Sequence, residues 1–260
     1  MQTSPQIEPR WVSWNPATGC TKVSEGCRNC YAKWFAERWR GVAGHPYELG
    51  FQLQLHPDRL ERPLRWRAPR RVFVDSMTDL FHEDIPDEYI ARVFDVMARA
   101  QRHVFHVFTK RPERMLHMAP GLPWPANVWL GVTVERDDYC ERANALRLVP
   151  AAVRFVSAEP LLGPLPSLDL NGIDWVVAGG ESGPRRRPPD PAWLRDLRDR
   201  CAAAGAAFFF KGWGGRVQGQ LGRRLDGREW LDRPSGLAVP DQRRATDHVP
   251  EPAAQLNLGL

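Results

Sequence analysis

Short apolar runs alternate with longer amphipathic segments along most of this chain. Residues 71–75 (RVFVD) form one such run, with the pattern of a buried strand. Residues 87–100 place Ile90, Val93 and Met97 at helical spacing. The same rhythm continues to residue 210. We therefore predict strands at residues 12–14, 51–55, 71–75, 103–108, 128–134, 153–157, 174–178 and 207–210, and helices at residues 31–39, 87–100, 112–118, about 137–148 and 191–204.

Strands that alternate with helices predict an α/β fold with a parallel sheet. For residues 1–212 the leading architecture is a (β/α) barrel, complete or partial and TIM-like. An open, doubly wound sheet is the alternative, because the strand at 51–55 is poorly defined. Residues 213–238 are rich in glycine, and we expect a small hairpin or extension packed on the barrel. Residues 239–260 are polar and aperiodic, and we expect a flexible tail.

The composition is mildly basic, with a net charge of +5 and a pI near 9.2. Arginine can grip phosphates, so nucleic acid is a candidate partner, with an ordinary solvated surface as the alternative. The polar N-terminal segment lacks the apolar core of a secretory signal, and no apolar run is long enough to span a membrane. We therefore expect a cytoplasmic protein without a membrane partner, whose thiols stay reduced.

Three of the five cysteines, Cys20, Cys27 and Cys30, fall in one short segment with the spacing C-x6-C-x2-C. In a reducing compartment this pattern indicates a metal site rather than a disulfide framework. The segment follows the first predicted strand, and active sites of parallel barrels lie at that end of the strands. Three thiolates suit an iron–sulfur cluster and leave one metal position free, whereas structural zinc sites use four ligands. Cys140 and Cys201 are expected to be ordinary half-buried helix residues.

Polar or glycine residues follow nearly every predicted strand, and in a barrel they would face the cysteines. The alternative is that loops are polar because they are solvated. Gly179 and Gly180 would let the backbone approach a ligand closely, although a plain turn explains them equally well. The candidate cofactor-binding residues are Asn15, Ser76, Lys110, Glu135, Ser157, Glu159, Gly179, Gly180, Glu181 and Lys211.

His82 is a candidate fourth metal ligand, but we expect a loop histidine next to two acids to be a surface residue. Four tryptophans flank the cysteine segment, at residues 11, 14, 34 and 39. We expect them to form a hydrophobic lid over the site, with stacking on nucleobases as the alternative.

Several sequence runs carry a resemblance to a known family. The run WNPATGCTKVSEGCRNCYA resembles the signature of the phage Gp37/Gp68-like family, also described as the DUF5131 or three-Cys-motif proteins. The runs RVFVDSMTDLFHEDIPDE, FTKRPERM, NVWLGVTVE, RFVSAEPLLGP, WVVAGGESGP, FFFKGWG and LDGREW are similar to that family as well. Together they extend from residue 11 to about residue 231.

The resemblance implies an enzyme akin to the radical-SAM superfamily. In that superfamily three cysteines bind a [4Fe–4S] cluster, and S-adenosylmethionine (SAM) chelates the fourth iron. Reductive cleavage of SAM then gives a 5′-deoxyadenosyl radical. The usual spacing there is C-x3-C-x2-C, and this chain departs from it with its six-residue gap. Glu159 or Glu181 would bind the amino group or ribose of SAM, and Lys110 or Lys211 would pair with its carboxylate or with those glutamates.

The resemblance also implies partners. These are a separate three-Cys-motif partner protein, a reductant such as flavodoxin or ferredoxin, and a nucleic acid or nucleotide substrate. Two other readings of the cysteines stay open. One is a zinc-binding nucleic-acid-binding protein that uses the three cysteines and one His or Asp. The other is an iron–sulfur redox protein without catalysis.

Overall fold

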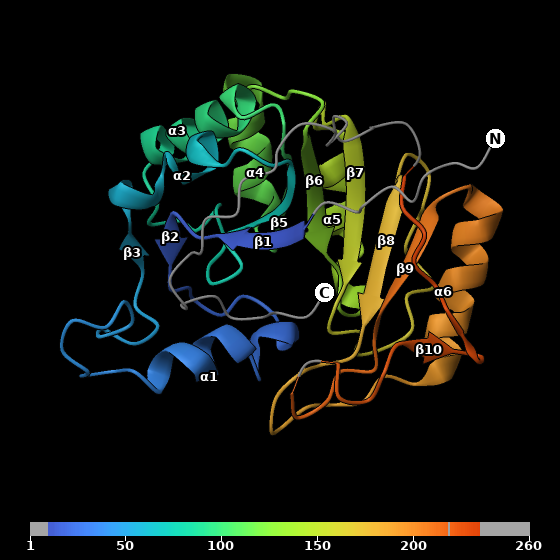
Figure 1. Cartoon of the computed structure of the whole chain (residues 1–260). Coiled ribbons are helices and arrows are strands. Elements are labelled where there is room, and N and C mark those ends of the chain that lie inside the picture. The colour runs from blue at the N-terminus through green and yellow to red at the C-terminus, as the bar shows by residue number, and fades with distance from the viewer. Residues whose placement is uncertain (1–9, 218, 235–260) are drawn as a thin grey trace, which may run out of the picture.

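The computed structural model describes residues 10–217 and 219–234, and its centre is a curved parallel sheet of seven strands (Figure 1). Each strand pairs in parallel with the next one along the chain. This sequential order is that of a barrel, whereas a doubly wound sheet reverses its order at a switch point. The seven strands are β1 (Arg10–Trp14), β4 (Arg70–Val74), β5 (Val104–Thr109), β6 (Val128–Thr133), β7 (Val153–Ala158), β8 (Trp175–Gly179) and β9 (Ala207–Gly212).

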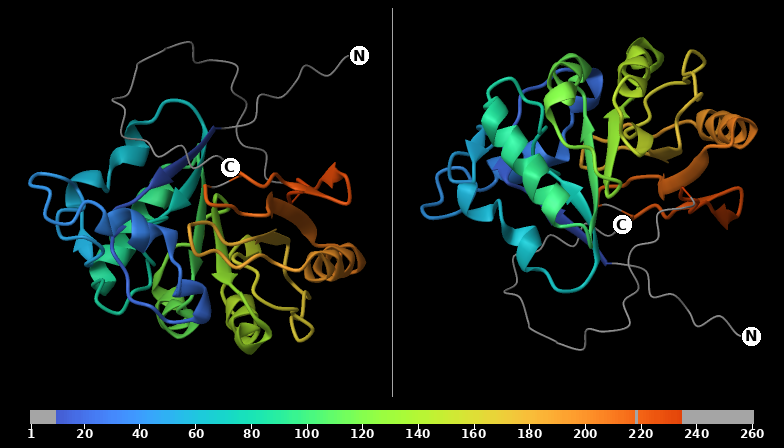
Figure 2. Two further views of the ribbon diagram at one scale, coloured as in Figure 1. Left: turned by 90° about the horizontal axis from the view of Figure 1, so that it is seen from below. Right: turned by 90° about the horizontal axis from the view of Figure 1, so that it is seen from above.

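The longer helices cover the outer side of this half-barrel (Figure 2). They are α3 (Asp87–Arg99), α4 (Pro112–Met118), α5 (Glu141–Arg147) and α6 (Pro191–Ala204). Outward-facing strand residues such as Phe105 and Val132 share one buried core with helix residues such as Val93 and Leu194. The predicted partial barrel and its helices are therefore confirmed, and the helix at 191–204 has the predicted bounds.

Aromatic side chains fill the inner face of the sheet. Trp129, Phe155 and Trp175 form a second buried cluster with neighbouring strand residues and contact one another edge to face or tilted. A side chain at Gly131 would overlap the ring of Phe155, so this central strand needs glycine there. No helix contributes to this cluster among the described residues, as expected for the interior of a barrel wall.

A complete barrel is not formed by the described strands, because β9 pairs on its far edge with an antiparallel segment instead of with β1. The Phe210 amide donates to the Trp230 carbonyl at 2.8 Å, and the Asp232 amide donates to the Phe208 carbonyl at 3.1 Å. Just before this segment, β10 (Arg224–Leu225) and β11 (Arg228–Glu229) form a hairpin. Its turn residues Asp226 and Gly227 both have positive φ, which is the geometry of a type I′ turn. The predicted tail at 239–260 lies outside the described residues.

The predicted strand at 51–55 is wrong as a member of the main sheet. Its last residues form β3 (Gln54–Leu55), which pairs in antiparallel with β2 (Ala17–Thr18). Both short strands lie in the long connection between β1 and β4, so β4 and not residues 51–55 pairs with β1. The remaining helical elements are α1 (Tyr31–Glu37), α2 (Arg62–Arg65) and the 3₁₀ turns at Glu25–Cys27, Pro57–Arg59, Ala119–Gly121 and Asp137–Tyr139.

No helix within residues 10–217 and 219–234 is long and apolar enough to cross a membrane. The two isolated cysteines, Cys140 and Cys201, are buried in the apolar core between the sheet and the helices. They are more deeply buried than predicted, and both carry free thiols.

Replacing Leu130 in the central strand β6 by alanine should cost about 2–5 kcal/mol of unfolding free energy, because the side chain is fully buried in the main core. Leu148→Ala is the matched control, since this leucine is 75% exposed and should change stability by less than about 0.5 kcal/mol. Denaturant titration of both variants measures the difference. Equal losses would contradict the assignment of the core.

Candidate functional site

The cysteine segment lies at the carboxyl ends of the strands, beside the loop that follows β4. The Gly19 amide donates to the Met77 carbonyl at 3.0 Å, and the pairing of β2 with β3 fixes the start of the segment. Gly19 has a φ of +88°, and a side chain there would overlap the Gln52 backbone, so only glycine fits. In the view of Figure 1, α1 follows the cysteines and lies below the sheet.

The three cysteines carry free thiols and are half-buried. Cys20 and Cys30 pack against a small apolar cluster that includes Met77, whereas Cys27 Sγ lies 3.7 Å from Ser24 Oγ. Within the described ranges, no three His, Cys, Asp or Glu side chains are arranged to hold a metal ion. The three sulfur atoms are therefore not gathered into one coordination sphere.

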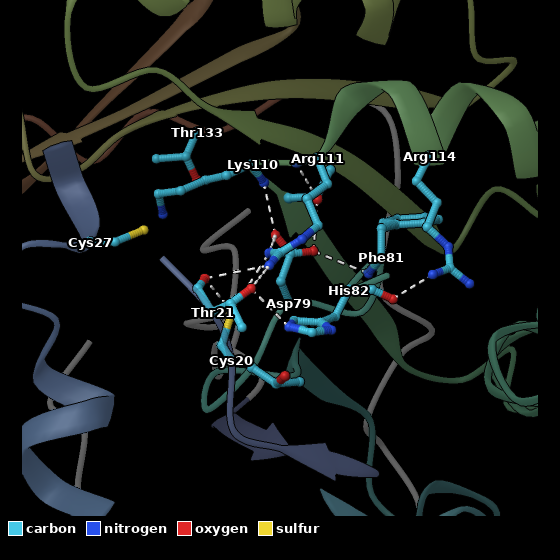
Figure 3. A network of polar contacts seen from close by, with 12 residues as sticks. Cys20, Thr21, Cys27, Asp79, Phe81, His82, Lys110, Arg111, Arg114 and Thr133 are labelled. Atoms are coloured by element: carbon cyan, nitrogen blue, oxygen red, sulfur yellow. Dashed lines mark hydrogen bonds and ion pairs between the residues drawn. The ribbon is translucent and has the colours of Figure 1, made fainter. Parts of the chain in front are cut away.

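Arg111 connects the cysteine segment to the end of β5 (Figure 3). Its Nη1 lies 3.6 Å from Cys20 Sγ and 3.2 Å from Asp79 Oδ2, and its Nη2 donates to Thr21 Oγ1 at 2.7 Å. Asp79 also accepts from the Thr109 hydroxyl at 2.7 Å. This buried ion pair holds a positive charge next to the first cysteine.

The environment of Cys20 is mixed. Burial, assisted by the negative charge of Asp79, raises the pKa of the Cys20 thiol to about 11, and Arg111 acts in the opposite direction. Cys20 is thus a protonated thiol at neutral pH in this structure. A metal or cluster that binds there must displace the proton, and the nearby guanidinium would then stabilise the thiolate.

Glu181 fixes the other end of the cysteine segment. It is buried at the end of β8 and accepts from Asn29 Nδ2 at 3.0 Å, between the second and third cysteines. Arg187 grips the same carboxylate with Nε at 2.9 Å and Nη2 at 2.6 Å, and its Nη1 donates to Glu25 Oε1 at 2.6 Å. Burial raises the pKa of Glu181, but the bonds from Arg187 and Asn29 outweigh it, and the pKa lies below its ordinary value.

Glu135 supports the middle of the segment from the end of β6. This carboxylate is fully buried; Oε2 accepts from Arg142 Nη1 at 2.9 Å and Oε1 accepts from the Ser24 hydroxyl. A side chain at Gly26 would overlap the Glu135 carboxylate, so the glycine lets the loop lie directly on it.

His82 is buried, which corrects the prediction of a surface residue. Its side chain is 1% exposed because the loop after β4 folds back under the cysteine segment. Nδ1 accepts from the Asp84 amide at 3.1 Å, and Nε2 lies 3.0 Å from Thr21 Oγ1. Burial, with Arg111 nearby, lowers the pKa of His82, which favours the neutral imidazole. The two contacts to Asp84 and Thr21 already engage both nitrogens of this ring.

The other predicted residues fall into two pairs and several single positions. Asn15 Oδ1 accepts from the Ser76 hydroxyl at 3.2 Å, and Lys211 Nζ donates to Glu159 Oε2 at 2.9 Å. Figure 3 shows the Lys110 side chain extending on the side of Cys27. Its Nζ has no partner within the described residues.

Gly179, Gly180 and Ser157 lie at the ends of β8 and β7. A side chain at Gly180 would overlap the Trp213 carbonyl, so close packing of the following segment explains this glycine. The nearest atoms to a side chain at Gly179 would be 3.4 Å away, an ordinary contact. Close packing therefore accounts for Gly180 but not for Gly179.

The predicted tryptophan lid does not form. Trp14 is buried in the main core and Trp11 packs on the inner face of the sheet. Trp39 stacks on His45 at 4.1 Å, and Trp34 projects from α1 with 49% of its surface exposed. The four residues lie apart because Trp11 and Trp14 belong to β1, Trp34 belongs to α1, and Trp39 lies in the turn after α1.

Asp79 and Arg111 are among the polar residues predicted to follow the strands at 71–75 and 103–108 and to face the cysteines. Other residues that hold the cysteine segment in place were not predicted. Asn29 lies between two cysteines, but it is uncharged and nothing in the sequence indicates its bond to Glu181. Arg142 and Arg187 come from a helix and an arginine-rich loop, and nothing local distinguishes them from surface arginines.

A family model described as "Protein of unknown function (DUF5131)" matches residues 4–234. The chain belongs to this family. No curated protein and no solved structure matches the chain. The matched range includes the cysteine segment, the whole parallel sheet and the C-terminal hairpin, so every site residue described above lies inside the family's shared region.

Replacing Gly26 by alanine should destabilise the protein by about 1–3 kcal/mol, because the new methyl group displaces Glu135 from its buried partners. Gly121→Ala is the control, since nothing lies within 4 Å of a side chain there. Thermal or denaturant unfolding compares the two. If both variants were as stable as the wild type, the close approach of loop and carboxylate would be refuted.

Glu181→Gln should cost about 1–3 kcal/mol near neutral pH, because a charged hydrogen-bond acceptor is lost. The folded-state pKa of Glu181 lies below the unfolded value of about 4.3, so its contribution is present above that pH and is lost as pH falls further. The gap between wild type and variant should thus shrink below about pH 4.3. Urea titrations at several pH values measure it, with exposed Glu61→Gln as control. A gap that widens in acid would contradict the prediction.

Proposed function

We propose that this chain is an iron–sulfur enzyme akin to the radical-SAM superfamily. Cys20, Cys27 and Cys30 would hold a [4Fe–4S] cluster, and SAM would bind at its open iron. When bound, the cluster supplies the electron that cleaves SAM and starts radical chemistry. The observation that carries the proposal is the position of three half-buried free thiols in one loop, at the carboxyl ends of a parallel half-barrel.

The residues around the loop fit an anionic cluster. Arg111 places its guanidinium beside Cys20 Sγ, and Cys is the usual ligand of such clusters. The sulfur atoms would have to come together, and the segment between Cys20 and Cys30 has few backbone bonds of its own to resist this. Asn29 and Ser24 would keep it anchored to the strand ends meanwhile.

Polar atoms at the strand ends fit a bound polar cofactor. Thr133 Oγ1 and Asp75 Oδ2 are buried at the ends of β6 and β4 without a hydrogen-bond partner in the described residues. The amino group of Lys110 is also unpartnered within that part of the chain. Lys110 would bind the carboxylate of SAM, while Glu159, held by Lys211, would bind its amino group or ribose. Ser76, Ser157 and Gly179 lie at the same end of the sheet.

The zinc reading needs a fourth protein ligand. A His or an Asp could supply it. Both ring nitrogens of His82 are engaged by Thr21 and Asp84, and Asp79, the aspartate beside Cys20, is paired with Arg111. This engagement favours the cluster. The proposal also includes a low-potential electron donor such as flavodoxin or ferredoxin, a three-Cys-motif partner protein, and a cytoplasmic location in which the thiols stay reduced.

The test is anaerobic reconstitution of the full chain with iron and sulfide, followed by metal analysis and incubation with SAM and a reductant. We expect about four irons per chain and release of 5′-deoxyadenosine. Alanine at Cys20, Cys27 or Cys30 should abolish both. Alanine at Cys140 or Cys201 should preserve both, because these thiols lie in the apolar core.

Two outcomes would overturn the proposal. Uptake of one zinc and no iron would assign the site to the zinc reading. A cluster that forms but yields no 5′-deoxyadenosine under reducing conditions would leave an iron–sulfur redox protein.

A further inference from the structure

A groove runs past the third cysteine on the outside of the site. It consists of two adjoining pockets of about 420 and about 440 Å³, which share Lys22, Arg28, Asn29 and Arg185 in their walls. The first pocket also includes residues of α1, and the second includes Arg187. Because the two pockets share four residues, they adjoin and form one groove.

The groove is strongly positive. Its walls include Lys22, Arg28, Lys33, Arg38 and Arg185. Among the described residues, Glu37 is the one carboxylate in its wall, and Arg40 already binds it at 2.6 and 2.8 Å. The nearby Glu25 is likewise paired with Arg187. Arg28 also lies 3.4 Å from Glu25, but Lys22, Lys33 and Arg185 form no ion pair with a carboxylate among the described residues. Several cations in one groove suit a ligand that carries several negative charges.

Two aromatic side chains stand in the same groove. Tyr31 and Trp34 are 40% and 49% exposed, and they lie three residues apart on one face of α1. The Arg38 guanidinium lies over the Trp34 ring at 5.0 Å from its centroid, and 49% of this tryptophan is still exposed. Large exposed aromatic surfaces beside a row of cations match a site for unstacked bases along a phosphate backbone.

We propose that this groove binds single-stranded nucleic acid, with phosphates on Lys22, Lys33 and Arg185 and a base stacked on Trp34. A duplex keeps its bases stacked on each other and so cannot use Trp34 in this way. Since Cys30 lines the same groove, a bound strand would lie beside the cluster site. That the strand is the enzyme's substrate rests on the proposed function, whereas its binding does not.

The test measures binding of fluorescent single-stranded oligouridylate and oligothymidylate to the full chain over a range of salt concentrations. Trp34→Ala should weaken binding by about 5- to 150-fold, as expected for loss of one base stack, and Trp34→Phe should restore most of it. The double variant Lys33→Ala/Arg185→Ala should lower the slope of log affinity against log salt by about 1.4. The matched control, Arg62→Ala/Arg99→Ala, removes two exposed charges outside the groove walls and should leave affinity unchanged.

Each contrary result would overturn the groove as a single-strand site. These are an equal loss in the control double variant, duplex of the same sequence bound as tightly as single strand, or binding of inorganic triphosphate and ATP without binding of oligonucleotides. Unchanged thermal unfolding of the variants excludes misfolding as the cause. The Cys27→Ala variant separates the two proposals, because it should lose the cluster while keeping oligonucleotide affinity.

Discussion

Buried carboxylates at the strand ends need hydrogen-bond donors, and the cysteine segment is held where it is because it supplies some of these donors. Glu181 takes Asn29 from the segment, and Glu135 takes the Ser24 hydroxyl. On the opposite side, Asp79 binds Arg111, which reaches Cys20. Leaving such a carboxylate unpaired inside the protein would cost several kcal/mol. A loop of small polar residues therefore acquires a defined path from the ends of three strands.

The sheet and the arginines have different roles in this arrangement. The half-barrel only brings the strand ends to a common edge, whereas arginines from more distant elements set the charges there. Arg142 comes from α5 and Arg187 from the loop after β8, and each serves a carboxylate that the sheet has buried. In a chain whose lysines are few, the bidentate geometry of arginine is well suited to this use.

The sequence predicts most of the scaffold, because periodicity records which faces are buried. One example is the strand at 71–75, which has an apolar pattern. Two others are the helices at 112–118 and 191–204, where the apolar pattern agrees with a proline at the helix start. The prediction is wrong for the segment at 51–55. Its side chains pack against the cysteine loop, which gives a strand-like pattern, but the segment has no place in the main sheet. An apolar pattern shows which side chains are buried, but it does not show which strand or loop they pack against.

The candidate site was predictable only in outline. Strand ends carry polar residues whatever their role, so Glu135 and Glu181 were visible while their partners Arg142 and Asn29 were not. Those pairs join residues far apart in sequence, and only the fold brings them together. His82 shows the same limit, because two neighbouring acids suggested solvent, although the ring is enclosed by the segment that passes over it.

The antiparallel segment on β9 has a consequence for the assembled state of the molecule. A parallel half-barrel would otherwise end in a row of free amide and carbonyl groups, which can recruit a strand from a neighbouring copy. Here Trp230 and Asp232 occupy those groups, and the hairpin before them holds the segment against the sheet. On that side the sheet cannot be extended by a further parallel strand, so a curved open wall can exist without inviting edge-to-edge aggregation there.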